Sequence, residues 1–333
     1  MVKISIFFLQ IITIITIFGC NSNNQCENIP EITNPINLNI ERLESSLLNI
    51  SNKEELKFFI ESEPEIAEFF LHRSDFPNDS IFINETFRKF SNPYLDSLGI
   101  EVNRVYGELS QLKKELEEAF SNYKYYFPDA RLPEIKTIVS GFGHDMLVSD
   151  TLIIIGLDYW MGEGAKYRPM GLYNYVLKRY EPEYIVPTIM LLYGIDGKIN
   201  INNKNDHTML SDMISYGKAF YFAKSVMPCT PDSILIWYSG EEWEGVIENQ
   251  RIIWSHFLQN ELLYETSHII KKKYVDDRPK TYEIGPKCPG RISTWLGWEI
   301  VKDYMKEEDV SLQELMKTTD AQMIFNKSKY KPD

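Results

Sequence analysis

The stretch from Met213 to Ala223 reads MISYGKAFYFA, and only Ser215 and Lys218 interrupt its apolar, aromatic or small residues. A helix that is apolar nearly all round is stable only where other elements cover every face. The stretch therefore predicts a core helix in a large fold. The chain has 333 residues, of which 44% are hydrophobic, and this is enough to bury such a core.

Lys218 has two interpretations. A catalytic lysine needs burial to lower its pKa, and the apolar run around Lys218 supplies that environment. A lysine stem also packs well against apolar neighbours while its ammonium reaches water or a carboxylate. Because Met213, Tyr216, Phe220 and their neighbours follow helical spacing, we interpret Lys218 as a residue of the core.

The N-terminus has the pattern of an export signal. Lys3 precedes a short apolar run from Ile4 to Phe18, which is too short to span a bilayer comfortably. Gly19 and Cys20 follow, and cleavage before a cysteine frees its thiol for lipid attachment. We expect residues 1–19 to be a lipoprotein signal peptide, Cys20 to carry lipid such as palmitate, and residues 20–39 to form the lipidated tether. A plain signal peptide or a short membrane anchor is the alternative.

The formal net charge of −13 argues against nucleic acid and against electrostatic docking on anionic lipid, because both need an excess of Lys and Arg. An exported chain meets an oxidising compartment, so its cysteines can pair. Cys229 and Cys288 both lie in proline-bracketed loops, and we expect a disulfide between them. The alternative is that Cys26, Cys229 and Cys288 are all free.

The pattern of the chain after the tether is mostly helical. Residues 40–126 are predicted to be helical nearly throughout, with a capping box at Ser51 and Glu54 and one long helix from Val105 to Tyr123. Two or three strands are expected between Phe127 and Gly162, in a small sheet. Further capping boxes at Ser239 with Glu242, and at Ser311 with Glu314, predict later helices. We expect a mostly helical α+β fold in which residues 40–333 form one globular domain.

No complete catalytic motif is present. The histidines are His72, His144, His207, His256 and His268. No two of them lie four apart, as the zinc-binding helix of a peptidase requires, and Tyr184–Gly194 contains no histidine. No glycine-rich turn has the spacing of a phosphate loop, so nucleotide binding is disfavoured. We predict no metal, no cofactor and no catalytic residue.

Two weaker patterns of acidic residues are better explained by ordinary structure than by a functional site. His144 and Asp145, with Asp150 and Asp158, are residues that suit a hard cation, but their spacing is more typical of ordinary turns. Glu244 and Glu248 lie one helical turn apart, as a glycosidase pair does, but acids scattered along one helix are usually a solvated face.

Five segments from residue 151 onward have a distinctive order and spacing. They are TLIIIGLDYWMG at 151–162, Tyr216 to Pro228, YSGEEWEGVIENQRIIWSHFLQNELLY at 238–264, PGRISTWLGWEIVKDYM at 289–305 and SKYKP at 328–332. Together they resemble the gliding-motility lipoprotein family GldB.

The resemblance implies a cell-envelope lipoprotein required for gliding, a non-enzymatic component or accessory of the gliding and protein-export machinery. It implies anchoring to a membrane through lipid, and we expect the protein to face the periplasm. The family is also remotely similar to zincin-type metallopeptidases, which would make this a degenerate, pseudoenzyme scaffold. Tyr184–Tyr193 would then replace the metal helix, and Tyr216-Gly217 would replace a ligand-bearing glutamate-glycine pair.

Two other functions remain open: a zincin-derived metal-dependent hydrolase with non-standard ligands, and a module that binds peptide or glycan. One packing detail is also predicted. Gly297 lies between Trp295 and Trp298, where a glycine in a helix indicates close approach of another backbone. The alternative is that the two tryptophans form a partner surface.

Overall fold

The small sheet includes a strand that the sequence does not predict. The computed structural model describes Cys26 and residues 29–332. Its strands are β1 (Ile40–Arg42), β2 (Glu134–Ile138), β3 (Met146–Val148) and β4 (Leu152–Gly156), in the order β1-β2-β4-β3. β2 is parallel to both β1 and β4, and β3 is antiparallel to β4. β1 falls in the region expected to be helical, so that expectation is wrong for residues 40–42.

Helices make up most of the remaining structure. They are α1 (Glu44–Leu48), α2 (Lys53–Ser62), α3 (Asp79–Phe90), α4 (Pro93–Tyr106), α5 (Ser110–Tyr126), α6 (Asn174–Leu177), α7 (Ile185–Ile195), α8 (Met209–Val226), α9 (Asp232–Ile236), α10 (Gly240–Glu248), α11 (Gln250–Gln259), α12 (His268–Val275), α13 (Ile292–Glu307), α14 (Leu312–Lys317) and α15 (Ala321–Ser328). A π-helical turn covers Ile66–Phe70, and short 3-10 turns cover Arg73–Asp75, Leu157–Trp160, Pro182–Tyr184 and Leu262–Tyr264. The mostly helical α+β class is confirmed.

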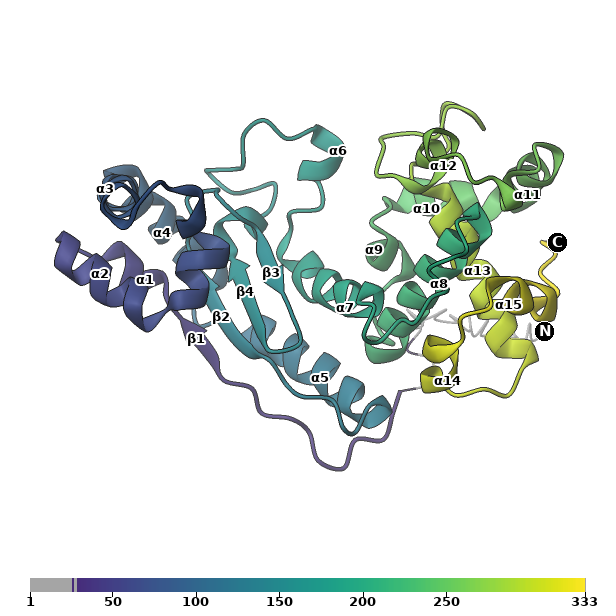
Figure 1. The fold of residues 1–333 in the computed structure, drawn as a ribbon, viewed down its shortest axis with the longest axis horizontal. Coiled ribbons are helices and arrows are strands. Elements are labelled where there is room, and N and C mark those ends of the chain that lie inside the picture. The colour runs from purple at the N-terminus through teal and green to yellow at the C-terminus, as the bar shows by residue number, and fades with distance from the viewer. Residues whose placement is uncertain (1–25, 27–28, 333) are drawn as a thin grey trace, which may run out of the picture.

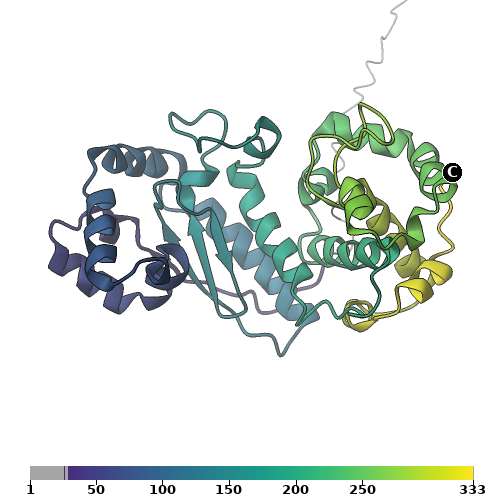
Figure 2. The same cartoon turned by 45° about the horizontal axis from the view of Figure 1, so that its top comes forward.

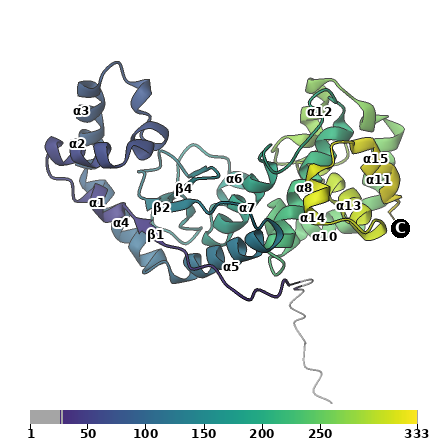
Figure 3. The same ribbon diagram turned by 60° about the horizontal axis from the view of Figure 1, so that its bottom comes forward.

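The elements follow one another across the molecule in chain order. The sheet lies between α1–α4 on one side and the C-terminal helices α8–α15 on the other, with α5 and α7 running between (Figure 1). The view in Figure 2 shows α5 and α7 alongside the strands. From below, the N-terminal extended segment runs along α5 toward the C-terminal helices (Figure 3). Hydrogen bonds hold this segment, since Ile36 N donates to Ser121 Oγ (2.9 Å) and Leu38 N donates to Glu117 Oε1 (3.0 Å).

The helix boundaries show which local signals were reliable. The capping boxes at Ser239 and Ser311 are both present and confirmed. α2 instead begins one residue later than predicted, because Asn52, rather than Ser51, caps it and accepts from Glu55 N. The long helix predicted from Val105 is interrupted, because Gly107 and Leu109 both adopt positive φ, at 50° and 60°. α4 and α5 are therefore separate helices.

The core contains the predicted central helix. α8 crosses α13 with its glycines against the other backbone: a Cβ on Gly217 would overlap the carbonyl oxygen of Gly297, and a Cβ on Gly297 would overlap that of Met213. The close approach predicted at Gly297 is confirmed. Trp295 and Trp298 are fully buried, and Trp298 stacks on Phe220 with ring centroids 5.2 Å apart. The alternative that these tryptophans form a partner surface is therefore wrong.

Candidate functional site

The side chain of Lys218 is completely buried in the core. Its Nζ donates to the main-chain carbonyls of Ile201 and Thr318, each at 2.8 Å. Burial lowers the pKa of Lys218 to about 8. The interpretation as a core residue is confirmed, but the ammonium contacts backbone carbonyls where water or a carboxylate was expected. Lys218 thereby joins α8 to the segment before it and to the end of α14.

α7 lies where the peptidase resemblance places a metal helix. Its sequence, IVPTIMLLYGI, offers no imidazole, carboxylate or thiolate, and nine of its eleven residues are buried. Gly194 packs directly on the backbone of Ala219 in α8, and Tyr193 donates its hydroxyl to Ser149 O at 2.9 Å. These residues do not fit a zinc ion, because structural and catalytic zinc require nitrogen, sulfur or oxygen ligands.

Two histidines from distant parts of the chain meet elsewhere in the fold. His72 follows the π-helical turn, and His144 lies between β2 and β3. Their Nε2 atoms are hydrogen-bond partners, and their ring centroids are 4.2 Å apart. His72 has a φ of 56°, which is uncommon for a residue other than glycine. The Nδ1 atom of His72 lies 3.9 Å from Asp75 Oδ2, on the opposite side of the ring from His144.

A cavity of about 480 Å³ opens beside this pair. It is lined by Phe70, Leu71, His72, Phe76, Glu85, Thr86, Arg88, Lys89, Phe90, Gly143 and His144. Burial lowers the pKa of His144, and the nearby His72 and Lys89 lower it further while Asp145 opposes them. Burial also lowers the pKa of Lys89, although the charge of Asp158 opposes this. The cavity therefore disfavours a positive charge on His144.

The loop that carries His144 is fixed by a buried carboxylate. Asp158 accepts hydrogen bonds from Ser140 N (2.9 Å), Ser140 Oγ (3.1 Å) and Phe142 N (2.6 Å). Ser140 Oγ in turn accepts from Gly143 N and His144 N. Burial raises the pKa of Asp158, and these donors work against that rise. Asp158 thus orients the loop rather than facing the histidine cavity.

The other acids considered as cation ligands do not join Asp158. Asp145 accepts from the hydroxyl of Tyr180 at 2.7 Å, and Asp150 pairs with Lys198 at 2.6 Å. Within the part of the chain that the structure describes, no group of three or more His, Cys, Asp or Glu side chains is arranged to hold a metal ion. Glu244 and Glu248 are both exposed on α10, which agrees with a solvated face.

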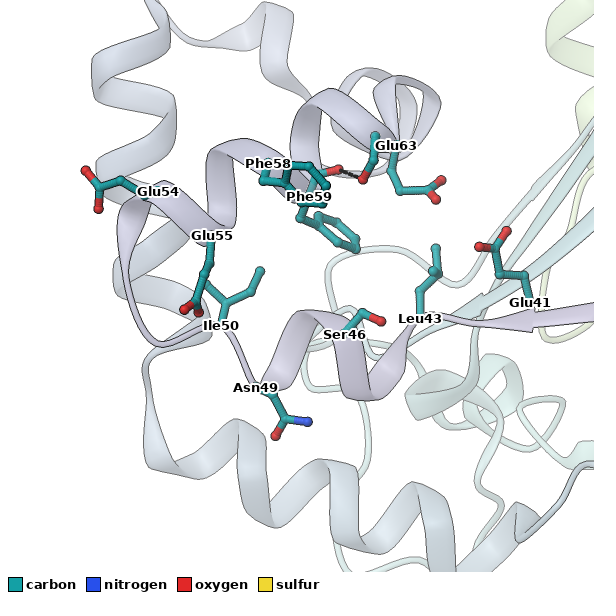
Figure 4. A pocket seen from close by; sticks show the side chains of 11 residues that line it. Glu41, Leu43, Ser46, Asn49, Ile50, Glu54, Glu55, Phe58, Phe59 and Glu63 are labelled. Atoms are coloured by element: carbon teal, nitrogen blue, oxygen red, sulfur yellow. Dashed lines mark hydrogen bonds between the residues drawn. The ribbon is translucent and has the colours of Figure 1, made fainter.

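An acidic groove of about 680 Å³ lies between β1, α1 and α2 (Figure 4). Its lining residues are Glu41, Leu43, Ser46, Asn49, Ile50, Glu54, Glu55, Phe58, Phe59, Ser62 and Glu63. Glu63 and Glu41 both pair with Lys136, at 2.5 and 3.2 Å, so a single positive charge is shared between two of the carboxylates. Phe58 is 74% exposed at its rim. The groove offers carboxylates and an aromatic surface, without a basic lining residue.

The disulfide differs from the predicted one. Cys26 is bonded to Cys229, across 203 residues, and Cys288 is a free thiol. The expected Cys229–Cys288 bridge is therefore wrong, as is the alternative of three free thiols. Burial raises the pKa of Cys288 to about 12, so its thiol is poorly reactive. Cys20, the expected site of lipid attachment, lies outside the described residues.

The fold and these sites define a mostly helical α+β protein whose core is closed around α8, with the apolar helix α7 packed against it. The chain belongs to the gliding motility protein GldB family, whose model matches residues 25–332. It is therefore a gliding-motility-related protein, as the resemblance implied. No curated protein and no solved structure matches the chain. No helix among the described residues is both long and apolar enough to cross a bilayer.

Proposed function

We propose that this protein is a cell-envelope lipoprotein, attached to a membrane through lipid on Cys20 and facing the periplasm, that serves gliding as a non-enzymatic accessory of the gliding and protein-export machinery. Family membership over residues 25–332 carries the link to gliding. The sequence pattern before Cys20 supports lipid attachment. In this proposal residues 1–19 are removed, and the globular domain acts as a binding partner for envelope proteins.

The apolar α7 supports the non-enzymatic part of the proposal. A degenerate zincin scaffold would keep the order of sheet, α7 and α8 while losing its ligands, and α7 offers no donor to an ion. In such a scaffold Tyr216 and Gly217 would stand in for a ligand-bearing pair, and Gly217 packs against α13 instead. The neighbouring Lys218 holds main-chain carbonyls.

The test is to complement a strain lacking the gene with wild-type protein and with Cys20→Ala. Wild type should incorporate a palmitate analogue, fractionate with membranes and restore gliding. Cys20→Ala should remain an unlipidated precursor in the soluble fraction and fail to restore gliding. Cys288→Ala is the matched control and should behave as wild type. Membrane fractionation that is unchanged in Cys20→Ala would contradict the proposal.

A metal-dependent hydrolase is the second candidate, because His72 and His144 do converge from distant segments. Two imidazoles fall short of the three protein ligands usual for catalytic zinc, and Lys89 and Arg88 line the same cavity. Metal analysis of purified protein separates the candidates. Stoichiometric zinc that is lost in His72→Gln and His144→Gln would favour the hydrolase.

A further inference from the structure

The Cys26–Cys229 bridge determines how far the globular domain can stand from a lipid on Cys20. The two Cα atoms are 4.3 Å apart, and Cys229 is exposed between α8 and α9. Cys26 is only six residues after Cys20. Because an extended chain spans at most about 3.5 Å per residue, the Cα atom of Cys229, across the bridge from Cys26, lies within roughly 25 Å of the lipid attachment point.

Without the bridge, a much longer stretch of chain would separate Cys20 from its first contact with the domain. In the described N-terminal segment, Ile36 N is the first main-chain group to hydrogen-bond the body of the protein, through Ser121 Oγ. Ile36 is sixteen residues after Cys20, a distance of up to about 55 Å when extended. The disulfide therefore shortens the reach of the tether by more than half and selects which face of the domain is nearest the membrane.

The surface beside Cys229 has the composition of a membrane-facing patch. Asn122 of α5 donates to Val226 O at the end of α8 (2.9 Å), so the C-terminal turn of α5 lies next to the bridge. That turn carries Tyr125, which is 55% exposed, and Tyr126, with ring centroids 5.1 Å apart. Tyrosine suits a membrane interface because its ring is apolar and its hydroxyl is polar.

The charged side chains beside Cys229 are paired with one another and do not attract this patch to lipid. Asp232, three residues after Cys229, is paired with Lys224 at 3.0 Å and with Lys302 at 2.9 Å. The protein as a whole carries a net charge of −13, which repels it from anionic lipid. Electrostatic attraction cannot hold this face to the membrane, so a covalent restraint is needed to do so.

We propose that the face formed by the Cys26–Cys229 bridge and the tyrosines at the end of α5 rests on the membrane surface, and that the bridge acts as a strap that holds it there. This inference rests on the proposed lipidation of Cys20. The strapped orientation directs α1–α4, at the far end of the molecule in Figure 1, away from the bilayer. The acidic groove between β1, α1 and α2 is then presented to partners beyond the membrane surface.

The test uses full-length lipidated protein in vesicles of phosphatidylethanolamine and phosphatidylglycerol. One variant replaces Tyr125 by p-azidophenylalanine, and a matched variant replaces Tyr94 of α4, which is 79% exposed. A donor dye is attached to the azide, which leaves the cysteines intact, and energy transfer to a headgroup-labelled lipid is measured. Transfer should be several-fold higher from position 125 than from position 94.

Removing the strap supplies the second measurement. In Cys26→Ser/Cys229→Ser, transfer from position 125 should fall toward that from position 94. Mild reduction of the wild-type bridge should produce the same change if the double variant folds poorly, with circular dichroism as the check on folding. Equal transfer from the two positions in the bridged protein, or no change after the bridge is removed, overturns the inference. Failure of wild type to float with the vesicles overturns the proposed lipidation instead, and the inference falls with it.

Discussion

Gly217 of α8 and Gly297 of α13 lie against each other, and neither has room for a methyl group. The obstacle on each side is a main-chain carbonyl, which cannot rotate away as a side chain can. Glycine in a helix costs about 1 kcal/mol relative to alanine, so these positions give up helix propensity in exchange for close contact between two buried helices. The free energy of unfolding should depend strongly on both positions.

Gly297→Ala is expected to destabilise the protein by about 3 kcal/mol or more, at the upper end of the range for overpacked cores. Gly217→Ala should behave similarly. Gly245→Ala is the matched control, because Gly245 also lies in a helix and a Cβ there meets nothing within 4 Å. The control should leave stability unchanged or raise it by up to about 1 kcal/mol. Urea unfolding measures all three, and equal stability of Gly297→Ala and Gly245→Ala would contradict the crossing.

Lys218→Met is expected to destabilise the protein at neutral pH by about 1–3 kcal/mol for each carbonyl left without a partner. Its pKa also predicts a pH effect. The unfolded chain binds this proton up to pH 10.5, whereas the folded protein releases it near pH 8. Between these values the unfolded state binds more protons, so the stability of the wild type rises with pH.

The rise between pH 7.5 and 9.5 should be on the order of 2 kcal/mol and should be absent in Lys218→Met. Measurements below pH 10 avoid the ordinary titration of tyrosine. Lys317→Met is the control, since Lys317 is exposed beside Thr318, and its pH profile should match the wild type. An unchanged profile in Lys218→Met would show that Lys218 is not the group responsible.

His144 predicts a loss of stability in mild acid. Its pKa lies below the usual 6.5 in the folded protein, because of burial first and then of His72 and Lys89. As the pH falls below about 6.5, the unfolded chain takes up a proton that the folded protein does not, so the stability falls. His144→Gln should weaken this fall, whereas His268→Gln, at an exposed site on α12, should not. Thermal unfolding between pH 5 and 7.5 measures the effect, and a steeper fall in His144→Gln would contradict it.

The cysteine pairing can be read by non-reducing peptide mapping. The peptide that contains Cys26 should be linked to the one that contains Cys229, and Cys288 should be free. Cys288 should react with maleimide slowly in the folded protein and rapidly in urea, because burial raises its pKa to about 12. Reduction of the bridge should cost about 2–5 kcal/mol of stability. A linkage between Cys229 and Cys288 would contradict the structure.

Local signals in the sequence were sufficient for features that depend on neighbouring residues. The caps at Ser239 and Ser311, the core helix around Lys218 and the close approach at Gly297 each follow from a few adjacent positions. β1 was missed because three residues are too few for a strand pattern, and its pairing with β2 joins segments about a hundred residues apart.

The contact between His72 and His144 and the bridge between Cys26 and Cys229 could not be predicted from the sequence, because each joins segments that are far apart in the chain. His72 and His144 lack a shared motif and meet only because the N-terminal helices fold back on the β2–β3 loop. The similar proline-bracketed loops of Cys229 and Cys288 predict the wrong partner for Cys229, because the connectivity of cysteines depends on the folded path of the whole chain. Both contacts tie the N-terminal part to later elements.

The contact of backbone with backbone between α8 and α13 also limits how the C-terminal half can deform. If one helix slid along the other by a full turn, a residue with a side chain would be forced into the place of a glycine. We therefore expect sliding to be opposed in both directions and the two helices to move together. In the proposed role beside the gliding machinery, this crossing would transmit a mechanical load from one helix to the other with little deformation.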